Sequence, residues 1–217
     1  MKQLILLLLS GVITTSYAQN WAFIDINPSG ESSPSFFTPF NGEMIFTADD
    51  GSNGRELWKT DGTVPGTVLL LDINPGPGSS NPRHFYPFNG ELYFSANDGS
   101  TGKELWKTDG SPGGTVQVAD INPSGDCDPF GFIEANGALF FSWGTYDNEG
   151  LWKTDGTELG TVQIQDPNSP DFIPIVHEAK AVINGKVVFS MYTAATFHEL
   201  GVSDGTAGGT GVLADIN

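Results

Sequence analysis

The chain has 217 residues, of which 26 are acidic and nine are basic, and its formal net charge is −17 at pH 7. A charge of this size and sign repels phosphate backbones and anionic lipids, which argues against nucleic acid and membrane surfaces as partners. The single cysteine, Cys127, cannot form an intrachain disulfide, so the fold depends on burial, for which 15 Phe, five Trp and five Tyr residues supply aromatic surface.

The first 18 residues have the features of a secretory signal peptide. Lys2 precedes an apolar stretch from Leu4 to Ile13, and the small residues Ser16 and Ala18 stand at the third and first positions before a cleavage site. Ten apolar residues reach about 15 Å as a helix, whereas a bilayer core is about 30 Å thick, so a membrane anchor is the weaker alternative. We therefore expect residues 1–18 to be cleaved and residues 19–217 to be secreted or displayed at the cell surface.

The rest of the chain repeats one unit about four times. The Asp of an Asp-Gly turn recurs at intervals of 48, 46 and 49 residues, and an Asp-Ile-Asn phrase and an Asn-Gly dipeptide keep the same period. A period in this range is typical of repeated supersecondary units. The recurring aspartates are Asp61, Asp109, Asp155 and Asp204.

Each unit is predicted to contain four short strands. In the first unit Asn41-Gly42 predicts a type I′ hairpin between residues 36–40 and 43–48, because both turn residues tolerate a positive φ. The second of these strands is apolar without alternation, which indicates burial on both faces. Residues 56–60 and 67–73 follow, and in later copies the last strand alternates, with Val116 and Val118 on one side, which indicates a half-exposed outer strand.

Four antiparallel strands per unit predict an all-β fold, a β-propeller of about four four-stranded blades. A β-solenoid is the alternative, because its coils also repeat with a fixed period. Residues 21–26 resemble a lone fourth strand without its three partners, so we expect an incomplete ring from a chain that is truncated after Asn217. The expected blades are residues 32–74, 79–122, 127–166 and 172–217.

The phrases Glu-Leu-Trp-Lys-Thr-Asp-Gly-Thr at 56–63 and Glu-Leu-Trp-Lys-Thr-Asp-Gly at 104–110 resemble the ELWxxDGT-repeat family of secreted bacterial proteins, sometimes described as hyalin-like. The resemblance covers residues 25–217 and implies a large exported repeat protein, often with a C-terminal sorting domain that this sequence lacks. It implies no catalytic residues. The fourth copy departs from the pattern, because Gly201 stands where Trp is expected, so blade packing there is in question.

The repeated tryptophans and aspartates each have a structural interpretation beside a functional one. An indole can stack on a sugar ring, but a residue that recurs once per unit is more simply an inter-blade packing residue. An aspartate before a turn glycine caps backbone amides, which is sufficient reason for its recurrence. The tryptophans are Trp58, Trp106 and Trp152.

Two loops, residues 49–54 and 97–100, are rich in oxygen and bent by glycine, as calcium loops are. Their candidate ligands are Asp49, Asp50 and Asp98. Calcium takes about six to eight oxygens, and neither loop has EF-hand spacing, so plain Asx turns are the alternative. We therefore predict no required cofactor, with calcium as the one candidate.

No catalytic constellation is evident. The three histidines have no metal-binding spacing, Cys127 has no consistent histidine partner, and Arg55 and Arg83 are too few for the three-arginine site that sialidase chemistry would resemble. The leading hypothesis is a secreted or surface scaffold that binds a glycan or an extracellular protein through loops at one propeller face. The alternatives are an extracellular carbohydrate-active enzyme, a hydrolase or lyase, and an architectural adhesion protein.

Overall fold

The computed structural model describes residues 24–143, 150–164, 180–193 and 197–214. Within them the only helical element is a 3-10 turn, η1 (Ala207–Gly209), and the strands form four antiparallel four-stranded sheets. The strands of each sheet are consecutive in the chain. Consecutive antiparallel blades confirm the predicted propeller architecture and leave no place for the β-solenoid alternative.

Each blade has the same order of strands. The first comprises β1 (Ser35–Phe40), β2 (Glu43–Asp49), β3 (Arg55–Thr60) and β4 (Val68–Leu71). The second comprises β5 (Arg83–Phe88), β6 (Glu91–Asn97), β7 (Lys103–Thr108) and β8 (Val116–Ala119). The third comprises β9 (Phe130–Ala135), β10 (Ala138–Trp143), β11 (Gly150–Thr154) and β12 (Val162–Gln163). The fourth comprises β13 (Lys180–Ile183), β14 (Lys186–Thr193), β15 (Phe197–Ser203) and β16 (Gly211–Ala214).

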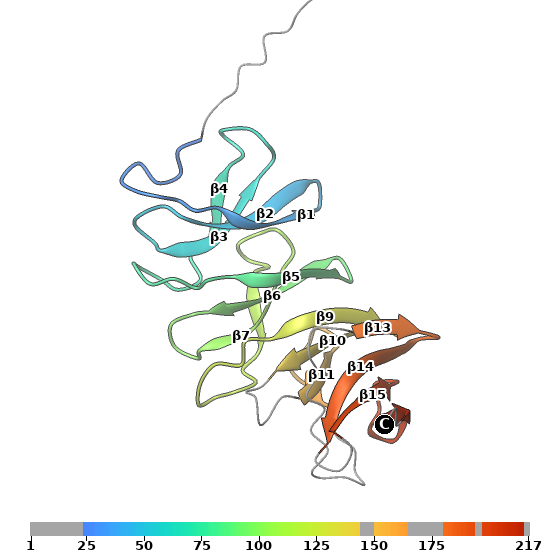
Figure 1. Ribbon diagram of the computed structural model, residues 1–217. Coiled ribbons are helices and arrows are strands. Elements are labelled where there is room, and N and C mark those ends of the chain that lie inside the picture. Colours follow the sequence, from blue (N-terminus) through green and yellow to red (C-terminus); the bar gives the residue numbers. More distant parts are fainter. Residues whose placement is uncertain (1–23, 144–149, 165–179, 194–196, 215–217) are drawn as a thin grey trace, which may run out of the picture.

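The four blades follow one another in an open fan, with blade 1 and blade 4 at its two ends (Figure 1). The first strands of successive blades contact one another, β1 with β5, β5 with β9 and β9 with β13. The first strand of each blade is therefore the inner one. The fourth strand, at the opposite edge of the sheet, is the outer one, as the sequence predicts.

The Asn-Gly turns form the first hairpin of every blade. Asn41 and Gly42 have φ angles of 49° and 81°, and they join β1 to β2 with Phe40 paired to Glu43. A type I′ turn needs positive φ at both central residues, which asparagine and glycine tolerate. The predicted hairpin is confirmed.

The hydrophobic core lies between the blades. One cluster joins two neighbouring blades and consists of Phe40, Ile45, Leu57, Leu70 and Ile73 of blade 1 with Leu92, Phe94, Ala96 and Trp106 of blade 2. Similar clusters join blades 2 and 3 and blades 3 and 4. Within the second strand, Ile45 and Phe46 are both buried although they point to opposite faces. Each sheet thus covers the apolar surface of its neighbour, which explains the apolar run without alternation.

The predicted alternation of the outer strand is wrong at its first residue. Val118 is buried, but Val116 is 41% exposed, although the two share one face of β8. Val116 leads out of the exposed turn that precedes β8, so the neighbouring blade does not cover it.

The N-terminal strand of the sequence prediction is not seen at residues 24–26, and residues 1–23, including the predicted signal peptide, lie outside the described part. Ile26 instead packs on a cluster of Phe46, Ala48 and Trp58 on the outer face of blade 1. A strand requires a hydrogen-bonded neighbour for its backbone groups, and this segment packs through its side chain instead.

Candidate functional site

The repeated aspartates close the turn between the third and fourth strands. Asp61 Oδ1 accepts hydrogen bonds from the backbone N of Thr63 at 2.9 Å and from its hydroxyl at 2.7 Å. These bonds lower the pKa of Asp61. The carboxylate also lies where a side chain at Gly66 would have to stand, which explains the second glycine of the turn. The same bonds recur at Asp109, Asp155 and Asp204.

A buried glutamate is a repeated feature that the sequence reasoning missed. Glu56 has no exposed surface, and its carboxylate accepts hydrogen bonds from the backbone N of Ile73 at 2.9 Å and of Ser80 at 2.7 Å, and from the Ser80 hydroxyl. Burial raises the pKa of Glu56 to about 7, against these hydrogen bonds, which lower it. Glu104 is equally buried and accepts from the backbone N of Ile121. The glutamate of each Glu-Leu-Trp phrase therefore binds the segment that leads into the next blade.

Two of the three repeated tryptophans pack in inter-blade clusters. Trp106 is 8% exposed and packs among residues of blades 1 and 2, and Trp152 packs against the cluster of blades 2 and 3. Trp58, also 8% exposed, packs on Phe46 on the outer face of blade 1. An indole packed in this way offers no open face for a sugar ring.

The candidate calcium loops are closed by their own hydrogen bonds. Asp50 Oδ1 accepts from the backbone N of Ser52 and Asn53, both at 2.8 Å, and Asp98 Oδ1 accepts from Ser100 and Thr101 at the same distance. Asp49 caps Gly51 in the same manner. Over the residues that the structure describes, no three His, Cys, Asp or Glu side chains gather in a group that could hold a metal ion. Calcium binding by these loops stays a prediction.

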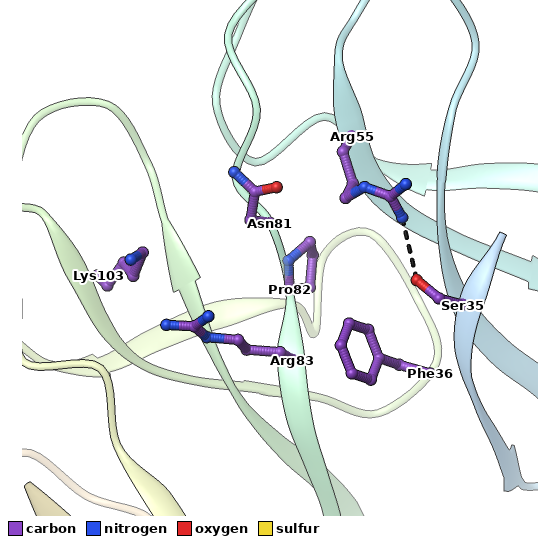
Figure 2. Close-up of a pocket in the computed structure, with 7 residues that line it drawn as sticks. All are labelled: Ser35, Phe36, Arg55, Asn81, Pro82, Arg83 and Lys103. Atoms are coloured by element: carbon purple, nitrogen blue, oxygen red, sulfur yellow. Dashed lines mark hydrogen bonds between the residues drawn. The ribbon is translucent and has the colours of Figure 1, made fainter. Parts of the chain in front are cut away.

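A pocket of about 280 Å³ lies at the junction of blades 1 and 2. It is lined by Ser35, Phe36, Arg55, Asn81, Pro82, Arg83 and Lys103 (Figure 2). Three of these are basic, in a chain that has only nine Lys and Arg residues. Phe36 contributes an aromatic side chain that is 53% exposed. The pocket thus combines positive charge with an apolar wall.

Two of the three cations are paired with carboxylates of the segment that leads into blade 3. Arg83 donates to both carboxylate oxygens of Asp128, from Nε at 2.9 Å and from Nη2, and Lys103 Nζ lies 3.6 Å from Asp126. Burial would raise the pKa of Asp128, but the bonds from Arg83 and Ser95 outweigh it and the pKa is lowered.

Arg55 is the third cation and has only neutral partners. Its Nη1 donates to the hydroxyls of Ser35 at 3.1 Å and Thr47 at 3.2 Å, and its Nη2 donates to the carbonyl of Ser33 at 2.9 Å. Figure 2 shows the guanidinium beside Ser35, on the opposite side of the pocket from Lys103. Among the described residues, no carboxylate forms an ion pair with Arg55.

These observations define a β-propeller fold with a cationic pocket between its first two blades. No family model matches the sequence, and no curated protein does. Similar solved structures include puromycin hydrolase, with a TM-score of 0.56 and 17% identity over 83% of this chain and 29% of that chain. A prolyl endopeptidase is another, with a TM-score of 0.50 and 9% identity over 80% of this chain and 25% of the endopeptidase chain. An α-L-arabinofuranosidase from Clostridium thermocellum has a TM-score of 0.37 and 16% identity over 88% of this chain and 76% of that chain.

The similarity shows the fold alone. Sequence identities of 17% and 9% do not show that two proteins share an activity. The chain also spans less than a third of the length of the first two structures. The arabinofuranosidase match, at a TM-score of 0.37, is too distant to bear on function. No helix in the described ranges is long and apolar enough to cross a membrane.

Proposed function

We propose that the chain is a repeat module of a secreted or cell-surface protein of the ELWxxDGT-repeat type, and that it binds an acidic glycan at the pocket between blades 1 and 2. The observation that carries the proposal is this pocket, where Arg55, Arg83 and Lys103 meet beside exposed Phe36 in a chain of net charge −17. The predicted signal peptide supports an extracellular location.

The shape and chemistry of the pocket suit a sugar better than a folded protein. Its volume of about 280 Å³ is near the lower end of small-ligand pockets, which begin at about 300 Å³. Phe36 and Pro82 supply an apolar wall, and the cations supply the few polar groups that fix a ligand's orientation. A sugar acid has the matching combination of an apolar ring face and a negative charge.

A carbohydrate-active enzyme, which the sequence leaves open, is the second candidate. Glycoside hydrolysis uses two carboxyl groups beside the scissile bond. The residues that line this pocket include no carboxylate. The composition of the pocket therefore favours binding over turnover.

A panel of immobilised polysaccharides, acidic and neutral, tests the proposal with residues 19–217. We expect retention of the protein on acidic members of the panel and no release of reducing ends. Release of reducing ends would favour the enzyme, and retention on no polysaccharide would overturn the binding function and leave the architectural adhesion protein.

A further inference from the structure

We infer that the pocket is built to receive a carboxylate at Arg55, so that its ligands are polysaccharides that contain uronic acids. The inference rests on the proposed glycan-binding function and adds the class of ligand. It comes from a comparison of two equivalent places in the same chain, the junction of blades 1 and 2 and the junction of blades 2 and 3.

The second junction already contains a carboxylate. The backbone N of Asp128 donates to the carbonyl of Lys103 at 2.9 Å, and Asp128 has a φ of 50°. Its carboxylate accepts from the guanidinium of Arg83 and from the hydroxyl of Ser95 at 2.8 Å. A guanidinium and a strand hydroxyl therefore hold a carboxylate at this junction.

The first junction has the same backbone and lacks the carboxylate. The backbone N of Asn81 donates to the carbonyl of Arg55 at 3.2 Å, and Asn81 has a φ of 49°, so Asn81 occupies the position of Asp128. Thr47 occupies the position of Ser95, since both follow the Asn-Gly turn by the same number of residues. The hydroxyl is present, and a guanidinium is supplied by Arg55 from the position of Lys103, because Ser35 stands at the position of Arg83. The acid is replaced by the amide of Asn81, whose Nδ2 donates to the carbonyl of Ser79 at 3.3 Å.

Arg55 retains donors for such a group. Its Nη1 donates two hydrogen bonds and its Nη2 donates one. Within the described structure its Nε has no acceptor. An arginine stays charged and its planar fork matches a carboxylate. Because Arg55 is only half-buried, a ligand can reach it from the pocket.

The aromatic side chain of Phe36 favours a uronic acid over a simple anion as the ligand. Phe36 lines the same pocket and is 53% exposed, so it leaves an apolar surface that a small ion would not cover. A uronic acid carries its carboxylate on a sugar ring, which can place the charge at Arg55 and the ring against the phenyl group. The carboxylate at Asp128 favours this anion over a sulfate, because the protein itself uses a carboxyl group at the equivalent position.

Calorimetric titration of residues 19–217 with trigalacturonic acid tests the inference, with its methyl ester and a sulfated disaccharide as comparison ligands. We expect the methyl ester and the sulfated sugar to bind at least about tenfold more weakly, because each lacks the planar charged carboxylate. Arg55→Gln should cause a similar loss. Asn81→Asp should do so too, because the new carboxylate would add a negative charge beside the pocket and compete with the ligand for Arg55.

Lys107→Gln is the control, since Lys107 pairs with Glu91 away from the pocket and should leave affinity unchanged. Thermal melts establish whether each variant is folded. If Arg55→Gln does not fold, Asn81→Asp still tests the inference. Equal affinity for acid and methyl ester, or full affinity in a folded Arg55→Gln or Asn81→Asp variant, would overturn the inference while the glycan-binding function stands. Failure to bind any polysaccharide would overturn both.

Discussion

Cys127 occupies, at the junction of blades 2 and 3, the position that Ser80 occupies at the junction of blades 1 and 2. Ser80 directly precedes Asn81, whose backbone N donates to the carbonyl of Arg55, the first residue of β3. Cys127 directly precedes Asp128, whose backbone N donates to the carbonyl of Lys103, the first residue of β7. Ser80 donates its hydroxyl to the buried carboxylate of Glu56. A thiol is a weak donor, so Glu104 lacks the strong hydroxyl partner that Glu56 has.

Replacing Cys127 with serine should therefore stabilise the protein. A hydroxyl that donates to Glu104 is expected to add about 1 kcal/mol to the free energy of unfolding, measured by urea titration. The matched change, Ser80→Cys, should remove a similar amount because it takes the donor from Glu56. A less stable Cys127→Ser variant would show that the two junctions are not equivalent in energy.

The thiol itself provides a probe of this junction. Cys127 is 3% exposed, and burial raises the pKa of its thiol further, so the native protein should not react with a thiol reagent at pH 8. Reaction should become complete in denaturant. Rapid labelling of the native protein would contradict the packing of blades 2 and 3 described above.

Glu56→Gln should lower the free energy of unfolding by about 1–3 kcal/mol. The carboxylate of Glu56 accepts a backbone N–H on each oxygen, so the amide nitrogen of glutamine would face one of these donors without accepting from it. The exposed Glu158 provides the control, and Glu158→Gln should change stability by less than about 0.5 kcal/mol. Equal stability of the two variants would contradict a structural role for Glu56.

Stability should fall as the pH rises from about 5 to about 7. Burial raises the pKa of Glu104 to about 7 from an ordinary value of 4.5, and Glu56 has the same shift. Between these values the folded state holds protons that the unfolded state has released, so the contribution to stability is complete below the unfolded pKa and is lost as the pH passes the folded one. Urea titrations at pH 5, 6, 7 and 8 measure the fall, and Glu104→Gln should reduce it. An identical slope in the wild type and in Glu104→Gln would contradict the assignment.

Blade 4 should depend on Met191 in a way that the other blades do not. Gly201 stands where blades 1 to 3 have Trp, and a Cβ atom there would lie 2.7 Å from Met191 Sδ and from a Phe189 ring carbon. Met191 is fully buried and occupies the position of Ala48 in blade 1, so it fills the space of the missing indole. Met191→Ala should cost about 2–5 kcal/mol.

The double variant Gly201→Trp with Met191→Ala restores the residues of blade 1 and gives a sharper test. Each single change should destabilise the protein, and the pair should cost clearly less than their sum in a double-mutant cycle. Additive costs would show that Met191 and the missing tryptophan do not share one space.

The features that the sequence predicts well are local or periodic. The Asn-Gly hairpins follow from the backbone preference of two residues, and the four strands per blade follow from a period that the whole chain shares. The burial of Glu56 was missed because a glutamate in a short strand is usually exposed, and its hydrogen-bond donors, Ile73 and Ser80, lie in the segment that leads into the next blade. Its recurrence before two of the three Leu-Trp pairs was the available signal.

The pocket could not be predicted for a similar reason. Arg55 and Arg83 are 28 residues apart and belong to different blades, so only the packing of β3 against the segment that leads into β5 brings them to one place. The compensation of Gly201 by Met191 also crosses between strands, whereas the sequence alone indicated only that the pattern was broken. Residue-by-residue comparison of the blades recovers both features once the register is known.

A crystal structure of the protein with bound trigalacturonic acid tests the central claim most directly. We predict a sugar ring against Phe36, with its carboxylate within about 3 Å of the Arg55 guanidinium. An oligosaccharide bound at another surface, with the pocket between blades 1 and 2 empty at a saturating concentration, would contradict it.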